Sequence, residues 1–157
     1  MASAYQKPYL DSSVFVSWIK GEVIAGVDRT RIASHILKCA ERGDFVVHTS
    51  TLTLAEVHKL RKGPILPEDE DQKMLAYFEN DFIQLIDVDR SIGEHANSLC
   101  RKHGLYPNDA IHLACALRAR CDVLLAWDNR FVKAQHPDIP IEEPRLLGQA
   151  NFGLSPR

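Results

Sequence analysis

Short apolar runs alternate along this chain with longer amphipathic stretches, and this alternation constrains the fold more than any other feature. The runs with the character of buried strands are 9–10, 45–49, 82–88, 123–127 and 139–141. The helical patterns occupy 12–20, 29–42, 53–62, 72–80, 90–103, 107–120 and 129–135. Because strands that alternate with helices form parallel sheets covered by helices, the pattern predicts an α/β sandwich around a parallel sheet.

The size and charge of the chain narrow the possible classes of protein. We expect one domain over 1–157, because 157 residues, 45% of them hydrophobic, suffice for one core. The net charge of −2 at pH 7 provides no basic field of the kind that simple nucleic-acid-binding modules use. A nucleic-acid partner would therefore have to be held by a local patch or by metal ions.

The cysteines and the apolar runs bear on the compartment. The four cysteines include no C-x-x-C pair, which disfavours a zinc cluster and indicates reduced thiols in a cytoplasmic protein. No apolar run approaches the roughly 18 residues of a membrane-spanning helix. We therefore expect no membrane association.

Four acidic residues fall at or just beyond the ends of the expected strands. Asp11 and Asp128 directly follow strands, Glu56 lies in the helix after the strand at 45–49, and Asp109 lies in the first turn of the helix after Pro107. In open parallel sheets, ligands bind beyond the carboxyl ends of the strands. The topology therefore predicts that these four acids share one crevice.

A crevice lined by carboxylates requires a partner of opposite charge. Mutual repulsion would protonate some of the acids, whereas a divalent cation would keep them ionised. Hard oxygen ligands suit Mg²⁺ or Mn²⁺. Such ions support phosphodiester hydrolysis because they activate water and neutralise the charge on phosphate oxygens.

Each acid also has a structural interpretation. Asp11 and Asp128 are suited to cap the helices that follow them. Glu56 completes a capping box with Thr53. Asp109 interacts favourably with a helix N-terminus whatever the function of the protein. The convergence of all four at one end of the sheet, rather than any single residue, favours a functional site.

Four segments, taken together and in order, resemble the acidic motifs of the PIN domain family. They are YLDSSVF at 9–15, LTLAEV at 52–57, PNDAIHLA at 107–114 and LLAWDNRF at 124–131. The resemblance extends over about residues 8–142, with a tail at 143–157. It is greatest to the single-domain VapC-type toxins of type II toxin–antitoxin pairs.

The resemblance implies a fold, an activity and partners. It implies an α/β/α sandwich with a central, mainly parallel sheet of about four or five strands, and an endoribonuclease dependent on Mg²⁺ or Mn²⁺. Asp11, Glu56 and Asp109 would be the principal metal ligands, Asp128 would complete the catalytic and metal-binding set, and Ser13 would support the ligands from behind. Members of the family commonly form homodimers, and an antitoxin covers the acidic pocket of the toxins.

The sequence also departs from the family pattern. Ala126 stands two residues before Asp128, where the family often has Thr or Ser. Residues 63–71, which read as a charged surface loop, and the tail after 142 lengthen the chain. The basic side chains at 59–62 are candidate RNA contacts, although a solvated helix end explains them equally well.

Other functions remain as alternatives. They are a PIN-domain nuclease of RNA processing that is not a toxin, a catalytically silent PIN-like interaction domain, and a phosphatase of the haloacid dehalogenase type. The phosphatase needs a second acid two residues after the first, where this chain has Ser13. His112, three residues after Asp109, is interpreted as a structural group at the edge of the core, with a hydrogen bond to an acid as the alternative.

Overall fold

The computed structural model describes residues 5–21, 23–58 and 64–148. Its centre is a parallel sheet of five strands. In spatial order the strands are β5 (Ile83–Ile86), β4 (Val47–Ser50), β1 (Pro8–Leu10), β6 (Val123–Leu125) and β7 (Ile141–Glu142). The first strand of the chain is thus the middle strand of the sheet, and the residues that follow β1 and its neighbours meet at one edge.

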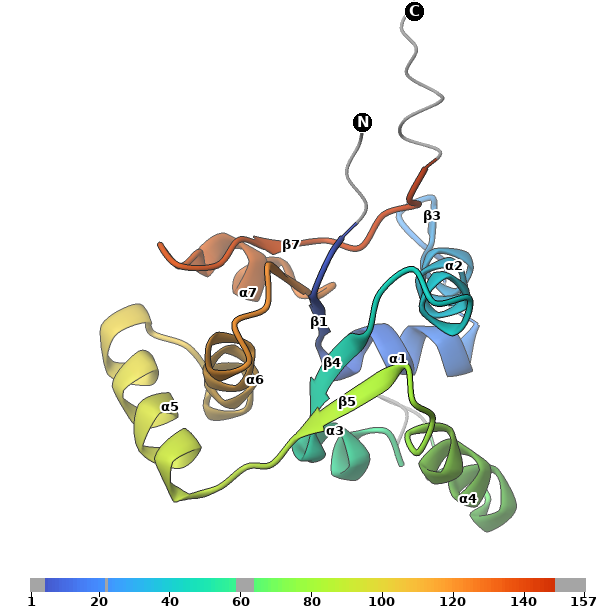
Figure 1. Ribbon diagram of the computed structural model, residues 1–157, viewed down its shortest axis with the longest axis horizontal. Helices are drawn as coiled ribbons and strands as arrows, with labels where there is room; N and C mark the ends of the chain where they lie inside the picture. The colour runs from blue at the N-terminus through green and yellow to red at the C-terminus, as the bar shows by residue number, and fades with distance from the viewer. Residues whose placement is uncertain (1–4, 22, 59–63, 149–157) are drawn as a thin grey trace, which may run out of the picture.

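Helices cover both faces of the sheet (Figure 1). On one face lie α1 (Ser12–Lys20), α2 (Arg29–Glu41), the short α3 (Thr51–Glu56) and α4 (Glu68–Tyr77). On the other lie α5 (Arg90–His103), α6 (Pro107–Arg118) and α7 (Asn129–Ala134). The prediction of an α/β/α sandwich around a parallel sheet is confirmed.

The central strands divide their side chains between two hydrophobic cores. In β1, Tyr9 packs under α5 and α6, whereas Leu10 packs under α1 and α2. In β6, Leu124 and Leu125 repeat this division. Successive side chains of a strand point to opposite faces, so a strand buried on both sides reads as a continuous apolar run. This is why residues 9–10 and 123–125 were recognisable from sequence.

Two expected elements have different bounds in the structure. The predicted loop at 63–71 is wrong from Glu68 onward, because Glu68–Tyr77 is helical and its first turn is entirely acidic. Acids stabilise a helix N-terminus through the macrodipole, so the charge run marks a helix start rather than a loop. The strand expected at 139–141 is instead Ile141–Glu142.

The expected helix at 53–62 also differs. It begins at Thr51 and ends at Glu56, and residues 59–62, with the candidate RNA-binding cations, lie outside the described residues.

Two further features were not predicted. A small antiparallel hairpin joins α1 to α2 through β2 (Val23–Ile24) and β3 (Val27–Asp28). Its turn has positive φ at both Ala25 and Gly26, at 52° and 80°, which matches the twist of a two-residue hairpin. The described part of the tail packs against the domain, because Leu147 is buried in the core formed with α1 and α2.

Two further findings concern the cysteines and the apolar character of the helices. All four cysteines are free thiols, as expected. Within the described ranges, no helix has both the length and the apolar character needed to cross a bilayer.

Candidate active site at the carboxyl edge of the sheet

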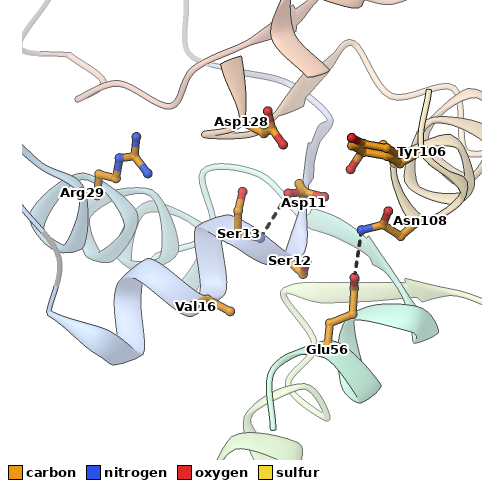
Figure 2. Close-up of a pocket in the computed structure, with 10 residues that line it drawn as sticks. Asp11, Ser12, Ser13, Val16, Arg29, Glu56, Tyr106, Asn108 and Asp128 are labelled. Atoms are coloured by element: carbon orange, nitrogen blue, oxygen red, sulfur yellow. Dashed lines mark hydrogen bonds between the residues drawn. The ribbon is translucent and has the colours of Figure 1, made fainter. Parts of the chain in front are cut away.

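The four acids singled out in the sequence line a single pocket (Figure 2). They reach it from four separate elements, beyond the ends of β1 and β6 and from α3 and α6. The other lining residues are Ser12, Ser13, Val16, Arg29, Tyr106 and Asn108. The structure therefore brings together the residues that the topology predicted to converge, while their roles stay a prediction.

Asp11 and Asp128 are held by the helices that they cap. The Asp11 carboxylate accepts a hydrogen bond from the backbone N–H of Ser13 at 3.2 Å, and its own backbone N–H donates to Leu125 at 2.9 Å. The Asp128 carboxylate accepts from the backbone N–H of Arg130 at 2.8 Å. Each acid thus fulfils the capping interpretation and still lines the pocket, because a cap occupies only part of a carboxylate.

The capping box predicted for Glu56 is wrong. The helix begins at Thr51 and is capped by Ser50, whose hydroxyl accepts from the backbone N–H of Leu52 at 2.9 Å. Thr53 is fully buried, and its hydroxyl lies 2.7 Å from that of Thr49. Glu56 is the last residue of α3, and its side chain lines the pocket (Figure 2).

The surroundings of Asp109 raise its pKa. It is only 8% exposed in the first turn of α6. Its pKa is raised to about 7, first by burial and then by the negative charges of Asp11 and Asp128. A carboxyl held among like charges away from water either takes up a proton or pairs with a cation.

Glu56 behaves in the opposite way. Burial raises its pKa, but hydrogen bonds from His112, Ser12 and Asn108 outweigh this effect, and its net pKa is lowered. The His112 contact is short, with Nε2 2.7 Å from Oε1 of Glu56, and the Asn108 contact is longer at 3.4 Å. Glu56 is therefore ionised when the neighbouring Asp109 is still partly protonated.

His112 is a residue whose importance the sequence interpretation underestimated. The side chain of His112 is fully buried, and its Nε2, which contacts Glu56, also lies 3.4 Å from Oδ1 of Asp11. On the other side of the ring, Nδ1 lies 2.6 Å from the hydroxyl of the buried Tyr9. Burial lowers the pKa of His112, but Asp11 and Glu56 outweigh it, and the net pKa is raised. The spacing of three residues from Asp109, one helical turn, was the available signal.

Ser13 supports the loop that carries Asp128. Its hydroxyl accepts a hydrogen bond from the backbone N–H of Trp127 at 3.2 Å. The Trp127 indole donates to the buried hydroxyl of Ser17 at 3.0 Å, and Trp127 is only 5% exposed. These bonds fix the end of β6 against α1, although Ala126 provides no hydroxyl there.

Arg29 lines the pocket and Arg130 packs on Tyr106, another lining residue, and no pattern in the sequence had singled out either arginine. The guanidinium of Arg29 lies 4.8 Å from the ring centroid of Trp127. That of Arg130 lies 4.4 Å from the ring centroid of Tyr106, which is 53% exposed. Figure 2 shows Arg29 and Tyr106 on opposite sides of the acids. The pocket is therefore acidic inside, with cations and an aromatic ring around it.

The donor set suits a hard divalent cation by its chemistry. Carboxylate oxygens are the ligands preferred by Mg²⁺ and Mn²⁺. Burial and the charges of Asp11 and Asp128 raise the pKa of Asp109, and a cation among these acids would oppose that effect. Across the described part of the chain, no three His, Cys, Asp or Glu side chains already converge closely enough to hold an ion. Binding would therefore require side-chain rotation, or waters that complete the coordination.

Asp89, an acid outside the pocket, has a structural role. Asp89 caps α5 by accepting from the backbone N–H of Ile92 at 2.9 Å, and it pairs with Arg118 through two hydrogen bonds. Asp89 therefore acts as a helix cap and as one half of a surface ion pair.

Comparison with known proteins identifies relatives of the fold. The sequence model of the PIN domain family matches residues 9–137. A toxin–antitoxin complex from Klebsiella pneumoniae is similar, with 20% identity and a TM-score of 0.61 over 84% of this chain and 94% of that one. VapC20 of Mycobacterium tuberculosis, described as a toxin that cleaves the sarcin–ricin loop, has 20% identity and a TM-score of 0.61 over 85% and 98% of the chains.

A third solved structure is similar to the same extent. VapBC2 of Rickettsia felis, bound to promoter DNA, has 17% identity and a TM-score of 0.61 over 89% of this chain and 100% of that one. No curated protein sequence matches the chain significantly.

Proposed function

This chain belongs to the PIN domain family, and we propose that it is a metal-dependent endoribonuclease that hydrolyses RNA phosphodiester bonds. The observation that carries the proposal is the convergence of Asp11, Glu56, Asp109 and Asp128, from four separate elements, on one pocket. Acids that served only as caps would have no reason to face one another. A divalent cation would also relieve the repulsion from Asp11 and Asp128 that, together with burial, raises the pKa of Asp109.

Asp11, Glu56 and Asp109 would hold Mg²⁺ or Mn²⁺, with Asp128 completing the set. When bound, such an ion makes water more acidic and neutralises charge on the phosphate. Asp128 is less buried than Asp11 and Asp109, and in this proposal it would orient a water that enters from solvent. Ser13 keeps the loop of Asp128 in place through Trp127.

Positive charge around the pocket would attract RNA to a protein whose net charge is negative. Arg29 and Arg130 carry positive charge beside the acids, and phosphate contacts of this kind give nucleic-acid affinity. The exposed ring of Tyr106 offers a stacking surface to an unpaired base. We therefore place single-stranded RNA across the rim, with one phosphate over the acids.

The partners of this activity follow from its relatives. The similar structures include toxin–antitoxin complexes, and this supports an antitoxin that silences the present chain in the cytoplasm. A homodimer belongs to the same proposal. Co-expression with the product of an adjacent short reading frame tests the antitoxin, since complex formation should abolish RNA cleavage.

A second candidate is a PIN-fold interaction domain without catalysis. It is favoured by one observation, that no three potential ligands in the described ranges are already arranged to hold a metal. The two candidates differ in whether the chain takes up a cation and cuts RNA.

The decisive experiment is RNA cleavage by the purified chain. With Mn²⁺, single-stranded RNA should be cut by the wild type, cutting should stop with EDTA, and Asp11→Asn and Asp109→Asn should each abolish it. Asp81→Asn, which removes an equal charge at an exposed position outside the pocket, serves as the control. Equal cleavage by Asp11→Asn, Asp109→Asn and the wild type would exclude the proposed site.

A further inference from the structure

The imidazole of His112 connects two of the acids across separate elements. Its Nε2 lies 2.7 Å from Oε1 of Glu56 at the end of α3, and 3.4 Å from Oδ1 of Asp11 after β1. Two carboxylates brought to one side of a buried ring repel each other, and the repulsion is strong because little water screens it. A hydrogen carried by Nε2 would offset that repulsion.

The surroundings of the ring determine where its hydrogen lies. A neutral ring with its hydrogen on Nδ1 would turn the Nε2 lone pair toward both carboxylates. The two other forms, the neutral ring protonated at Nε2 and the imidazolium, both donate from Nε2 to Glu56. Tyr9 completes the arrangement, because burial raises the pKa of its hydroxyl well above the usual value and leaves it a hydrogen to donate to Nδ1 at 2.6 Å.

Glu56 needs such an anchor. It is the last residue of a six-residue helix. Its Oε1 makes the short contact with His112 at 2.7 Å, Oε2 accepts a longer one from Asn108 at 3.4 Å, and Ser12 also hydrogen-bonds to the carboxylate. The His112 contact is therefore the shorter of the two measured contacts that hold this carboxylate, and the same Nε2 lies near Asp11.

We propose that His112 is a positioning residue, whose Nε2–H holds Glu56 beside Asp11 in the arrangement that binds the cation, with Tyr9 fixing the ring. The inference rests on the proposed function, since it concerns the same pocket. It assigns to His112 no contact with RNA or with the metal. Loss of a side chain that hydrogen-bonds to a metal ligand and orients it typically weakens metal binding by about 10–100-fold.

The first test measures Mn²⁺ binding, without RNA, by electron paramagnetic resonance of the free ion. His112→Phe keeps a ring of similar size but lacks the donor, and it should weaken Mn²⁺ binding about tenfold or more. His112→Gln, which retains an N–H donor, should recover part of the loss. Tyr9→Phe removes only the hydroxyl and should weaken binding to a smaller extent. His48→Phe, at another buried histidine that lies outside the pocket, is the control and should bind as the wild type does.

The second test determines which ring nitrogen of His112 carries a hydrogen in the metal-free wild type. Long-range ¹H–¹⁵N correlation spectra of histidine-labelled protein should show Nε2 of His112 protonated. An unprotonated Nε2 overturns the inference even where the phenylalanine variants fail to fold. Wild-type affinity for Mn²⁺ in a folded His112→Phe variant also overturns it, with the proposed function intact. A wild type that takes up no Mn²⁺ refutes both the inference and the proposed function. The same protein should then fail to cleave RNA in the cleavage assay.

Discussion

Replacing Asp109 with asparagine should stabilise the metal-free protein while it abolishes the proposed activity. The folded state raises the pKa of Asp109 from 3.8 to about 7. At about 1.4 kcal/mol per unit, this shift makes the ionised carboxyl cost about 4 kcal/mol of folding free energy. Asp109 is only 8% exposed, so water screens little of this cost.

The sign of the effect depends on pH. A raised acid pKa means that the folded state keeps the proton longer than the unfolded chain does. Stability is therefore lost as pH rises from about 4 to about 7, and the loss is complete above that range. The amide introduced by Asp109→Asn has no proton to lose. At pH 8 the variant should be more stable by up to about 4 kcal/mol, and at pH 4 by less than about 1 kcal/mol.

Thermal unfolding in EDTA, followed by circular dichroism at pH 8 and pH 4, measures this difference. In a domain of this size, each kcal/mol of stability shifts Tm by about 2–4 °C. Asp109→Asn should therefore raise Tm at pH 8 by about 10 °C. Asp81→Asn, an exposed acid outside the pocket, should not do so. Added Mn²⁺ should stabilise the wild type more than the variant. An equal Tm for wild type and Asp109→Asn at pH 8, or a gain of the same size at pH 4, would refute the reasoning.

Three further predictions concern the rim, the core and a surface ion pair. Tyr106→Ala should raise KM for single-stranded RNA about fivefold or more in steady-state cleavage, through loss of base stacking and of the ring on which Arg130 rests; an unchanged KM would exclude the stacking role. Phe131→Ala, at a fully buried position, should cost about 3–5 kcal/mol in urea unfolding; a loss below about 1 kcal/mol would contradict the packing described for α7. Because Arg118 lowers the pKa of Asp89 to about 2, Asp89→Asn, which can still cap the helix, should lower Tm at pH 7, and the difference should shrink as pH falls from about 4 toward 2; a pH-independent difference would show that the charge pair is not responsible.

The sequence predicted those parts of the site that depend on the order of the elements along the chain. Asp11 and Asp128 were identifiable because a buried parallel strand reads as an apolar run and the next residue lies at the carboxyl edge. Glu56 and Asp109 were placed at the same edge by the order of the elements, and the family motifs supported all four acids. In each case a local pattern was enough, because the sheet topology converts position along the chain into position in space.

Features that depend on tertiary contacts were missed or misread. His112 read as a core residue because its contacts with Glu56 and Tyr9 join segments far apart in sequence. Arg29 stands at the rim because the hairpin of β2 and β3 delivers the start of α2 there, and that hairpin has only a short sequence signal. The acidic run from Glu68 was misread because charge alone does not distinguish a loop from a helix N-terminus.

The central claim, that the four acids form a cation site, is tested most directly by locating the ion. Crystals grown with Mn²⁺ and measured near the manganese absorption edge should show an anomalous peak in the pocket, within coordinating distance of Asp11, Glu56 and Asp109. The peak should vanish in Asp109→Asn crystals grown under the same conditions. An empty pocket at millimolar Mn²⁺ in wild-type crystals, or a peak that persists unchanged in the variant, would contradict the account.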